Sequence, residues 1–490
     1  MFIRLSFNLL LCLLSSFSLE GQLSGMQASD WSVAIGRDKS GLEIQRELSG
    51  GVKISTERYM LERVTEQSIF SGSVEKSHMR FHWDLGNRLL RKTNLLTGES
   101  VHFDYDPWDN LFKADYKDGK QVETLYKAPD AIGNLFRTSE RKDRKYGKSG
   151  RLLEDRKYSY HYDGEGNLVL KSRLRPEAPT TPLGQEGDWS YEWQGNGMLR
   201  SVKRPNGETV EFEYDPLGRR ISKTYKGKTI RWVWDGNVPL HEWTEESDVT
   251  TWLFEEGTFV PTAKIVGDKS YSIITDYLGT PIHAFDSHGA KVWERNLDIY
   301  GKIRTGNSTL VPFLFQGQYF DEETDLCYNR FRYYSPDTGL YISQDPIGLA
   351  GGLSLYGHVN DCNFEMDPYG ESKMPWHHLI PQEMFKNPEF MRQLNRITGG
   401  KGRSYINRQG AVITESLHKS IHRGAGGGAW NETFENWFEE LLENGEQITV
   451  RGLQTQIKNM VRDFNIPRSS RMFAGKYRRR SKRNFKSKYH

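Results

Sequence analysis

Two groups of histidines near the C-terminal end have the residue types and spacing needed for metal or acid–base chemistry. Residues 375–385 read PWHHLIPQEMF, which places His377 and His378 side by side next to an apolar segment. Imidazole titrates near neutrality and binds metals through either ring nitrogen. His418 and His422 are four residues apart, so on a helix they share one face and can converge on a single ion. Such pairs are also common on helix surfaces, and the spacing alone does not establish a metal site.

The elements expected to position these histidines are a strand pair and a helix. Tyr405 and Ile406 predict a first strand, residues 407–410 a turn, and residues 411–413 a second strand. Thr414 is a good N-cap for a helix that begins at Glu415. In the following segment, four aromatic residues at helical spacing indicate a packed core rather than platforms for stacking bases: Trp430, Phe434, Trp437 and Phe438.

Two carboxylates stand earlier in the chain, each in an Asp-Pro-x-Gly sequence. Asp345 lies in QDPIG and Asp367 in MDPYG. Two carboxylates held close together do not both ionise readily, so one can keep a proton as general acid while the other activates water. Asp-Pro-x-Gly is also a common turn and helix-capping sequence. From the residues alone, the turn interpretation is favoured.

The body of the chain repeats a hairpin-like pattern from residue 80 onward. Alternating aromatic residues lead into Tyr-Asp or Trp-Asp, a turn with Gly or Asn follows, and an apolar strand comes next. The pattern recurs in RFHWDLGNRLL (80–90), VHFDYDPWDNLFK (101–113), YSYHYDGEGNLVL (158–170), WSYEWQGNGMLRS (189–201), VEFEYDPLGRRIS (210–222) and IRWVWDGNVPLHE (230–242). Asp and Gly supply the capping and the positive φ of a tight turn. The repeats therefore predict stacked antiparallel hairpins that form a continuous sheet.

Composition divides the chain into two parts with opposite charge. Residues 371–490 hold 22 Lys and Arg against 11 Asp and Glu, a net +11, whereas residues 1–370 hold 45 against 53, a net −8. This asymmetry predicts two fused functions with different partners. The chain has 3 cysteines, which are too few for a disulfide framework or a CxxC zinc site.

The repeats resemble YD repeats, the building block of Rhs and teneurin-type proteins. Residues 315–370, from FQGQYFDEETDLCYNRFRYYSPDTG to the DPYG motif, resemble the core segment that closes the repeats in bacterial Rhs proteins. The resemblance implies a mainly β fold, an antiparallel shell that encloses a variable C-terminal toxin domain. It also implies that Asp345 and Asp367 form a self-cleaving aspartyl protease, although Glu371 stands where the family usually has an apolar residue. Complete shells carry many more repeats, so we expect an incomplete shell or a fragment.

The segment after Gly370 resembles the HNH/endonuclease VII superfamily, in particular its histidine-doublet (AHH-like) toxins, with Trp376 in place of the usual small residue. The resemblance implies an α+β, ββα-metal nuclease that uses one divalent ion, Mg²⁺, Mn²⁺, Ni²⁺ or Zn²⁺. The implied metal ligands are His377, His418 and His422. His378 is implied as general base, and Asn407 as the residue that orients either the base or the strand pair. A divalent ion offsets charge at the leaving oxygen while a neutral imidazole takes a proton from water.

The C-terminal end is a candidate nucleic-acid-binding tail, and the N-terminal end is a signal-like segment. Residues 476–490 carry eight Lys and Arg and no acidic residue, which fits phosphate binding but also a solvated tail. The candidate contacts are Lys476, Arg478, Arg479, Arg480, Lys482 and Arg483. Residues 1–20 combine Arg4 with a short apolar run, which is typical of a secretory signal. A buried first strand, or a start codon inside a longer reading frame, remains open.

The expected domains are a signal-like segment (1–20), YD repeats (21–312), the Rhs core (313–370), the nuclease toxin (371–475) and the basic tail (476–490). Two functions are open. One is a secreted or surface-exposed toxin delivered to a target cell, which cleaves DNA in preference to RNA, needs an immunity protein and uses a secretion-system carrier. The other is an inactive structural or adhesive surface protein. Stable membrane insertion is not expected, because no segment after the signal-like one is apolar enough to span a bilayer.

Overall fold

The computed structural model describes residues 14–17, 23–39, 41–59, 63–174, 187–350, 354–371, 376–407, 410–412, 421, 428–464 and 466. Within these residues the body is two long antiparallel sheets in which strands follow one another in chain order. The first sheet contains β1 (Leu14–Phe17), β2 (Leu23–Ala28), β3 (Trp31–Arg37), β4 (Glu43–Leu48), β5 (Val52–Arg58), β6 (Val64–Ser71), β7 (Val74–Trp83), β8 (Leu89–Asn94), β9 (Ser100–Tyr105), β10 (Leu111–Asp118) and β11 (Gln121–Tyr126).

The second sheet is longer and has the same sequential order. It contains β14 (Lys145–Tyr146), β15 (Leu152–Glu154), β16 (Tyr158–Tyr162), β17 (Leu168–Arg173), β18 (Trp189–Trp193), β19 (Leu199–Lys203), β20 (Thr209–Tyr214), β21 (Arg220–Tyr225), β22 (Lys228–Asp235), β23 (Val238–Trp243), β24 (Thr250–Phe254), β25 (Pro261–Val266), β26 (Lys269–Thr275), β27 (Pro281–Asp286) and β28 (Lys291–Glu294). Two small pairs accompany the sheets: β12 (Ala128–Pro129) with β13 (Leu135–Phe136), and β29 (Asn296–Leu297) with β30 (Ile303–Thr305).

The hairpin turns have the chemistry that the repeats predict. At the β20–β21 turn, the Asp215 amide donates to the Arg219 carbonyl at 2.9 Å. The Asp215 carboxylate accepts from the amides of Leu217 and Arg219 at 2.9 and 2.8 Å. Gly218 has a φ of 75°, a conformation that costs glycine little. Asp84, Asp106, Asp163, Asp276 and Asp286 cap their turns in the same way. Asp84, Asp106, Asp163 and Asp215 lie in four of the six predicted hairpins, and the strands of the other two pair directly as β18–β19 and β22–β23, so all six hairpins are confirmed.

The sheet begins well before the repeats that the sequence reveals. Six strands, β1–β6, precede residue 74 in the described part of the chain, and their turns lack the Tyr-Asp signature. Buried residues of β2–β6 pack with buried residues of β24–β27 in one cluster. The indole of Trp31 donates to the Ser272 hydroxyl at 3.0 Å across this contact. The two sheets therefore meet at this end of the shell.

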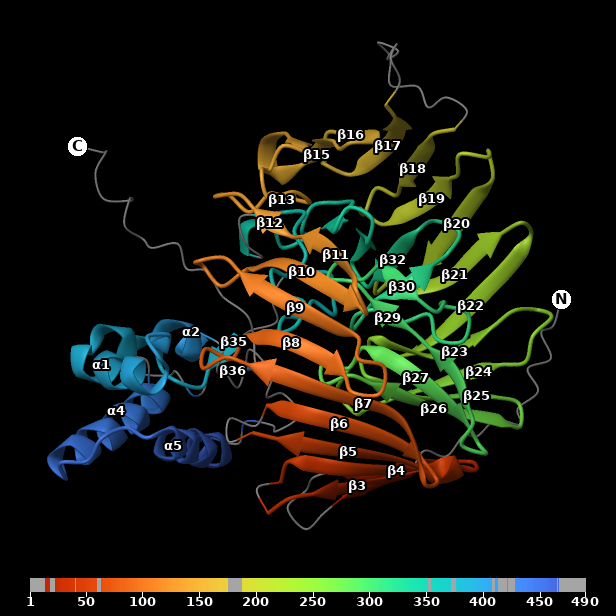
Figure 1. Ribbon diagram of the computed structural model, residues 1–490. Helices are drawn as coiled ribbons and strands as arrows, with labels where there is room; N and C mark the ends of the chain where they lie inside the picture. The colour runs from red at the N-terminus through yellow and green to blue at the C-terminus, as the bar shows by residue number, and fades with distance from the viewer. Residues whose placement is uncertain are drawn as a thin grey trace, which may run out of the picture.

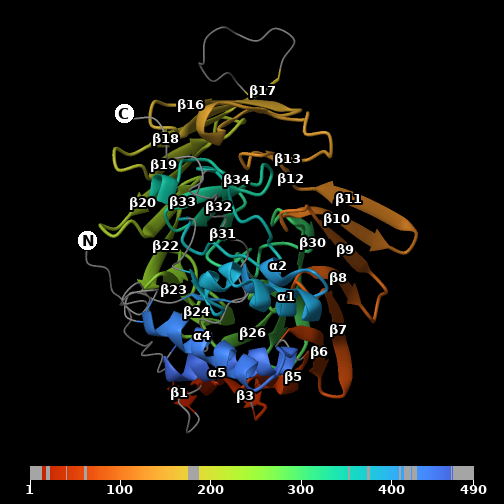
Figure 2. The ribbon, with the colours of Figure 1, turned by 90° about the vertical axis from the view of Figure 1, so that its left-hand side faces the viewer.

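The core segment is a small sheet inside the shell. Its strands are β31 (Tyr319–Asp321), β32 (Leu326–Asn329), β33 (Arg332–Ser335) and β34 (Leu340–Tyr341). Figures 1 and 2 show these strands between the two long sheets, and their side chains share one hydrophobic cluster with both sheets. Asp321 is fully buried and pairs with Arg220 and Lys223 of β21, with Lys223 Nζ 3.0 Å from its Oδ1. This ion cluster fixes the core to the second sheet.

The C-terminal domain has a hydrophobic core of its own. Its elements are β35 (Trp376–His378), α1 (Pro388–Ile397), α2 (Gly402–Asn407), β36 (Gly410–Val412), α4 (Gly428–Glu443) and α5 (Val450–Asp463). Trp430, Phe434 and Phe438 are buried on α4 and Trp437 packs against them, so the predicted helical core is confirmed. The predicted strand at Tyr405 and Ile406 is wrong. Both residues belong to α2 and are buried in the domain core, and the Gln454 side chain on α5 donates to the Tyr405 hydroxyl.

The helices lie together on one side of the shell. Figure 1 shows them beside the ends of the first sheet, and Figure 2 shows them in front of the core. A direct contact joins the two parts: Lys401 Nζ lies 2.7 Å from Asp84 Oδ2 in the β7–β8 turn. The C-terminal domain is therefore docked on a hairpin turn of the shell.

Candidate self-cleavage and nuclease sites

Both Asp-Pro-x-Gly sequences form turns, in which the Gly348 amide donates to the Asp345 carbonyl at 2.8 Å and the Gly370 amide to the Asp367 carbonyl at 3.5 Å. The Asp345 carboxylate accepts from the Ile347 amide at 3.1 Å, and the Asp367 carboxylate accepts from the Glu371 amide at 3.1 Å. The turn interpretation is therefore correct as a description of conformation. A turn role alone does not explain why the two aspartates are buried. Each is only 5% exposed, whereas the Asp215 turn lies at the surface.

Folding of the core brings the two aspartates to one buried arginine. Arg332 of β33 places Nη2 at 3.6 Å from Asp345 Oδ2 and 3.3 Å from Asp367 Oδ2. Its Nε donates to the Gly370 carbonyl, and Nη1 donates to the Leu355 carbonyl at 3.1 Å. Sequence reasoning identified both carboxylates but missed the cation that they share. Only the pairing of β32, β33 and β34 places it there.

Neutral groups complete the environment of Asp367. The Tyr341 hydroxyl donates to Asp367 Oδ2 at 2.7 Å, and the Asn329 side chain donates to the Asp367 carbonyl at 2.8 Å. Burial raises the pKa of Asp367, and Asp345 adds to this, while Arg332 and Tyr341 oppose it. A raised pKa extends the protonated form of Asp367 toward neutral pH, which suits a general acid.

The residue that follows the DPYG turn is held close to the pair. Gly370 has a φ of 64°, and a Cβ added there would lie 2.4 Å from the Asn329 carbonyl. Glu371 is half-buried, and burial, Asp345 and Asp367 all raise its pKa. The departure from an apolar residue at this position therefore adds a third carboxyl group beside the two aspartates. Residues 372–375 lie outside the described residues.

The histidine doublet lies on a strand that pairs with a distant segment. β35 and β36 are antiparallel, with His377 opposite Ala411 and His378 opposite Gly410. Asn407 is the last residue of α2 and precedes β36 by a short link. The predicted pair of residues 405–406 with 411–413 is therefore wrong in its first strand, whereas its second strand is present as β36 and pairs with the doublet strand. Backbone pairing brings the doublet and the Asn407 region to one place.

The remaining nuclease residues lie outside the described part of the chain. These are His418, His422 and the helix predicted after Thr414, together with Lys476, Arg478, Arg479, Arg480, Lys482 and Arg483 of the tail. Most of the signal-like segment 1–20 also lies outside it. Among the described residues, no group of three or more His, Cys, Asp or Glu side chains could hold a metal ion. The proposed metal set depends on two histidines that are not among them.

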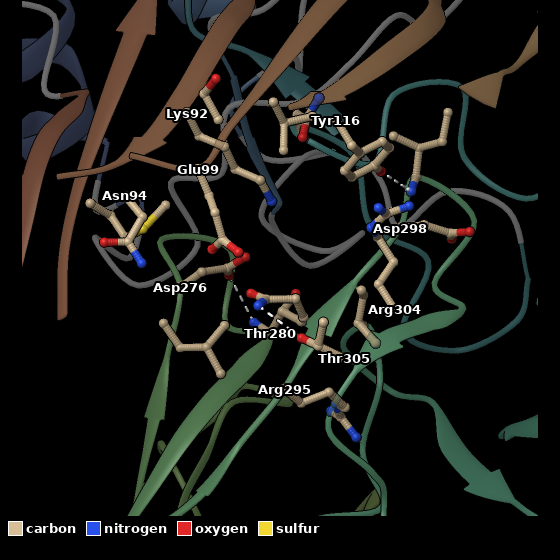
Figure 3. A pocket seen from close by; sticks show the side chains of 18 of the residues that line it. Lys92, Asn94, Glu99, Tyr116, Asp276, Thr280, Arg295, Asp298, Arg304 and Thr305 are labelled. Atoms are coloured by element: carbon tan, nitrogen blue, oxygen red, sulfur yellow. Dashed lines mark hydrogen bonds between the residues drawn. The ribbon is translucent and has the colours of Figure 1, made fainter. Parts of the chain in front are cut away.

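A cavity of about 420 Å³ lies elsewhere in the shell, where no sequence motif predicts a site. Figure 3 shows Lys92, Glu99 and Tyr116 approaching it from the first sheet, opposite Asp276 and Arg304. Burial lowers the pKa of Lys92 and raises the pKa of Asp276. Among the described residues, none of the predicted catalytic or metal-binding side chains lines this cavity. Its lining comes from hairpins far apart in the chain, so no local motif marks it.

Comparison with known families decides the nature of the shell. The sequence profile of the teneurin YD-shell matches residues 21–350. The chain belongs to the teneurin YD-shell family. The matched region ends before the C-terminal domain.

Three curated relatives carry related sequences. The probable deoxyribonuclease RhsA of Dickeya dadantii (strain 3937) is 33% identical over 240 residues, 46% of this chain and 16% of that protein. The double-stranded DNA deaminase toxin A of Burkholderia cenocepacia (strain H111) is 30% identical over 328 residues, 59% of this chain and 22% of that protein. The tRNA nuclease WapA of Bacillus subtilis (strain 168) is 28% identical over 289 residues, 54% of this chain and 12% of that protein. The chain thus spans less than a quarter of each relative.

Among solved structures, the Photorhabdus luminescens Tc holotoxin pore aligns with 74% of this chain and 20% of its own chain, at 13% identity and a TM-score of 0.47. Within the described residues, no helix is both long and apolar enough to cross a membrane.

Proposed function

We propose that this YD-shell protein is a polymorphic toxin of the Rhs type whose C-terminal domain is a metal-dependent endonuclease. The observation that carries the proposal is the strand pair β35–β36, which joins the histidine doublet to the segment after Asn407. This pairing occurs within residues 371–490, whose net charge is +11 with the basic tail included. The names of three relatives describe action on DNA or tRNA, which supports a nucleic acid as the substrate.

In this proposal each histidine has one role. His377, His418 and His422 would hold one divalent ion, which would offset negative charge on the phosphate and on the leaving oxygen. His378 takes the proton from the attacking water, and Asn407 orients it. The general base must not coordinate the metal, so one histidine of the doublet can be a ligand while the other is the base. The basic tail holds the phosphate backbone without reading sequence. DNA is the expected substrate in preference to RNA.

The nuclease is tested on the purified full chain with plasmid DNA and with RNA, with and without Mg²⁺, Mn²⁺, Ni²⁺ or Zn²⁺. General-base catalysis contributes about 10²–10⁴-fold, so His378→Ala should lose most cutting while still binding metal. The matched control is His288→Ala, at an exposed hairpin turn, which should cut like the parent. Cutting by His378→Ala at the parent rate would refute the assignment.

Variants of the proposed metal ligands and of the tail should have different effects. His418→Ala and His422→Ala should each lower both metal affinity and activity, because each removes a ligand. Metal binding that survives loss of both helix histidines would contradict the site. Deletion of residues 476–490 should weaken substrate binding and reduce its salt dependence while the chemistry persists. If no metal restores cutting of either substrate, the structural or adhesive function is the better account.

We also propose that the core cuts its own chain between Gly370 and Lys373. Asp345 takes a proton from water as the water oxygen adds to the peptide carbonyl carbon. As the carbon–nitrogen bond breaks, its electron pair stays on nitrogen, which takes a proton from Asp367. Each chain reacts once, so the pair does not need to be reset. Asp345→Asn should abolish the C-terminal fragment, whereas Asp215→Asn alters a similar turn without an Arg332 contact and should leave it. A single full-length band in every protein would exclude self-cleavage.

Delivery and protection complete the proposed function. An export route, a secretion-system carrier and a cognate immunity protein follow from a toxin of this type. N-terminal sequencing of protein from the native host tests the signal-like segment, and an intact Met1 on cytoplasmic protein would remove it. Growth of cells that express the full chain, with and without a candidate immunity protein, tests immunity.

A further inference from the structure

The cavity between the two long sheets has a wall of packed aromatic side chains. Phe81 of β7 and Phe103 of β9 are buried and line the cavity. Tyr277, in the β26–β27 turn, meets the Phe81 ring edge-on, with 5.1 Å between the ring centres. Its hydroxyl donates to the Asn363 carbonyl at 2.9 Å. The aromatic wall is therefore held in place by both sheets and by the core segment.

Another wall is closed by contacts between the first sheet and the β29–β30 pair. Arg304 Nη1 of β30 lies 2.7 Å from Glu123 Oε2 of β11, and the guanidinium lies 3.9 Å from the centre of the Tyr116 ring. The Tyr116 hydroxyl accepts from the Ile299 amide at 2.9 Å. The space inside, about 420 Å³, is within the range of about 300–1,000 Å³ that is typical of small-molecule sites.

Lys92 brings an amine into this space. Figure 3 shows its side chain extending from β8 toward the centre of the cavity, on the side of Asp276. Among the described residues, no carboxylate forms a hydrogen bond or an ion pair with the amine. Asp276 Oδ1 accepts from the amides of Leu278 and Thr280, each at 2.9 Å. An ammonium group that is shielded from water and lacks a bonded anion is costly.

We propose that this cavity binds a small monocarboxylate with an apolar body, whose carboxylate accepts hydrogen bonds from Lys92. The aromatic wall would cover the apolar body, and the amine would meet the single negative charge. A dianion such as phosphate fits less well, because one amine at the centre of the cavity matches one negative charge and Asp276 lies nearby. The site is separate from both the proposed nuclease and the proposed self-cleavage site.

The groups around Lys92 favour its charged form only in part. Burial lowers the pKa of Lys92, Asp276 and Cys362 oppose this, and Arg304 adds to it. A bound carboxylate would favour the charged amine and raise its pKa. Burial raises the pKa of the Cys362 thiol to about 12 and the pKa of the Tyr116 hydroxyl well above its usual value, so both stay neutral near pH 7. The other charged groups that line the cavity near Lys92 include Lys76, Glu99 and Lys117.

The test measures the binding of three matched probes to the purified full chain by isothermal titration calorimetry. Phenylbutyrate carries a carboxylate, whereas phenylbutanol and phenylbutylamine keep the same body without the negative charge. A hydrogen bond to a charged group contributes about tenfold or more in affinity. The parent should therefore bind phenylbutyrate at least about tenfold more tightly than phenylbutanol, and phenylbutylamine no better than phenylbutanol.

Lys92→Met keeps the apolar stem of the side chain and removes the amine. It should weaken phenylbutyrate binding at least about tenfold and leave phenylbutanol binding unchanged. Because the variant removes a poorly solvated charge, its unfolding midpoint in urea should not fall. The matched control is Lys53→Met, since Lys53 is exposed on β5 of the same sheet. It should bind all three probes like the parent.

Two further measurements connect the binding to the amine itself. Phenylbutyrate affinity of the parent should fall between about pH 7 and pH 10 as Lys92 loses its proton. Lys92→Met keeps Lys76 and Lys117, so a much weaker pH dependence in this variant would assign the effect to Lys92. Reductive methylation followed by mass spectrometry needs no variant: saturating phenylbutyrate should protect Lys92 and leave Lys53 reactive.

Three results would overturn the proposal. The first is a parent that does not bind phenylbutyrate at millimolar concentration, or that binds phenylbutanol or phenylbutylamine equally well. The second is folded Lys92→Met with the phenylbutyrate affinity of the parent. The third is methylation of Lys92 at an unchanged rate in the presence of phenylbutyrate, which would place the bound probe elsewhere.

Discussion

The ion cluster that joins the core to the shell should be a major source of stability. Arg220 contacts both carboxylate oxygens of Asp321, with Nη2 3.1 Å from Oδ1, and both residues are buried. Its guanidinium also lies over the Trp232 and Tyr328 rings, 4.6 Å from each centre. In Arg220→Met the aspartate loses its closest partner but keeps Lys223.

The expected loss of unfolding free energy depends on Lys223, the partner that Asp321 keeps. Breaking a buried ion pair costs about 3–5 kcal/mol when one charge is left without compensation. Because Lys223 still pairs with Asp321, we place Arg220→Met near the lower end, at about 3 kcal/mol. Arg231→Met is the matched control, since Arg231 lies on the adjacent strand β22 and is exposed. It should change the free energy of unfolding by less than about 0.5 kcal/mol.

The assay is urea unfolding followed by tryptophan fluorescence, with Trp232 close to the altered side chain. Burial opposes ionisation of Asp321, but Arg220 and Lys223 outweigh it, so the pKa of Asp321 lies below its usual value. A depressed carboxyl pKa stabilises the fold above the unfolded-state pKa of about 4, and this contribution is lost as pH falls through the folded pKa. The difference between parent and Arg220→Met should therefore be complete near pH 7 and shrink below about pH 4. Equal stability of Arg220→Met and Arg231→Met at neutral pH would refute this reasoning.

Three further variants test other contacts. Lys401→Ala removes the ion pair with Asp84. In size-exclusion chromatography, the cleaved C-terminal fragment should therefore dissociate from the shell at a lower salt concentration than in the parent. An unchanged salt dependence would count against docking at this turn. Phe434→Ala should lower the stability of the C-terminal domain by about 3–5 kcal/mol, seen as a lower unfolding midpoint, whereas a shift below 1 kcal/mol would contradict its place in the core. In Gly370→Ala, the new side chain would sit at a positive φ and clash with the Asn329 carbonyl. The C-terminal fragment should therefore form much more slowly than in the parent. Cleavage at the parent rate would show that the turn tolerates a side chain.

The repeats could be read from the sequence because each turn encodes its own geometry. Asp215 and Gly218 sit in one short segment, and capping plus positive φ need nothing distant. Strands such as β3 (Trp31–Arg37) have the same pairing but lack this turn signature, so their place in the sheet became visible only in three dimensions. Local chemistry thus predicts hairpins, whereas the extent of the sheet depends on contacts between segments far apart in the chain.

In the candidate sites, too, the features set by local sequence could be predicted and those set by distant contacts could not. Asp345 and Asp367 were recognisable as a pair from their repeated sequence context. Arg332 was not, because its position depends on the strand pairing of the core. Tyr405 and Ile406 have residue types typical of strands, yet burial against α5 favours a helix there, since tertiary packing overrides local propensity. The true partner of the doublet strand lies beyond α2, a pairing that no local pattern indicates.

The sequential strand order has a consequence for synthesis on the ribosome. Each strand of the two long sheets pairs only with its neighbours in the chain, so the shell can grow one strand at a time as the polypeptide emerges. The core segment follows the last strand of the second sheet, and the C-terminal domain comes after it. Arg332 and Asp367 can meet only when β31–β34 have reached their places between finished sheets. The order of translation would thus delay the proposed cut after Gly370 until both long sheets have been synthesised.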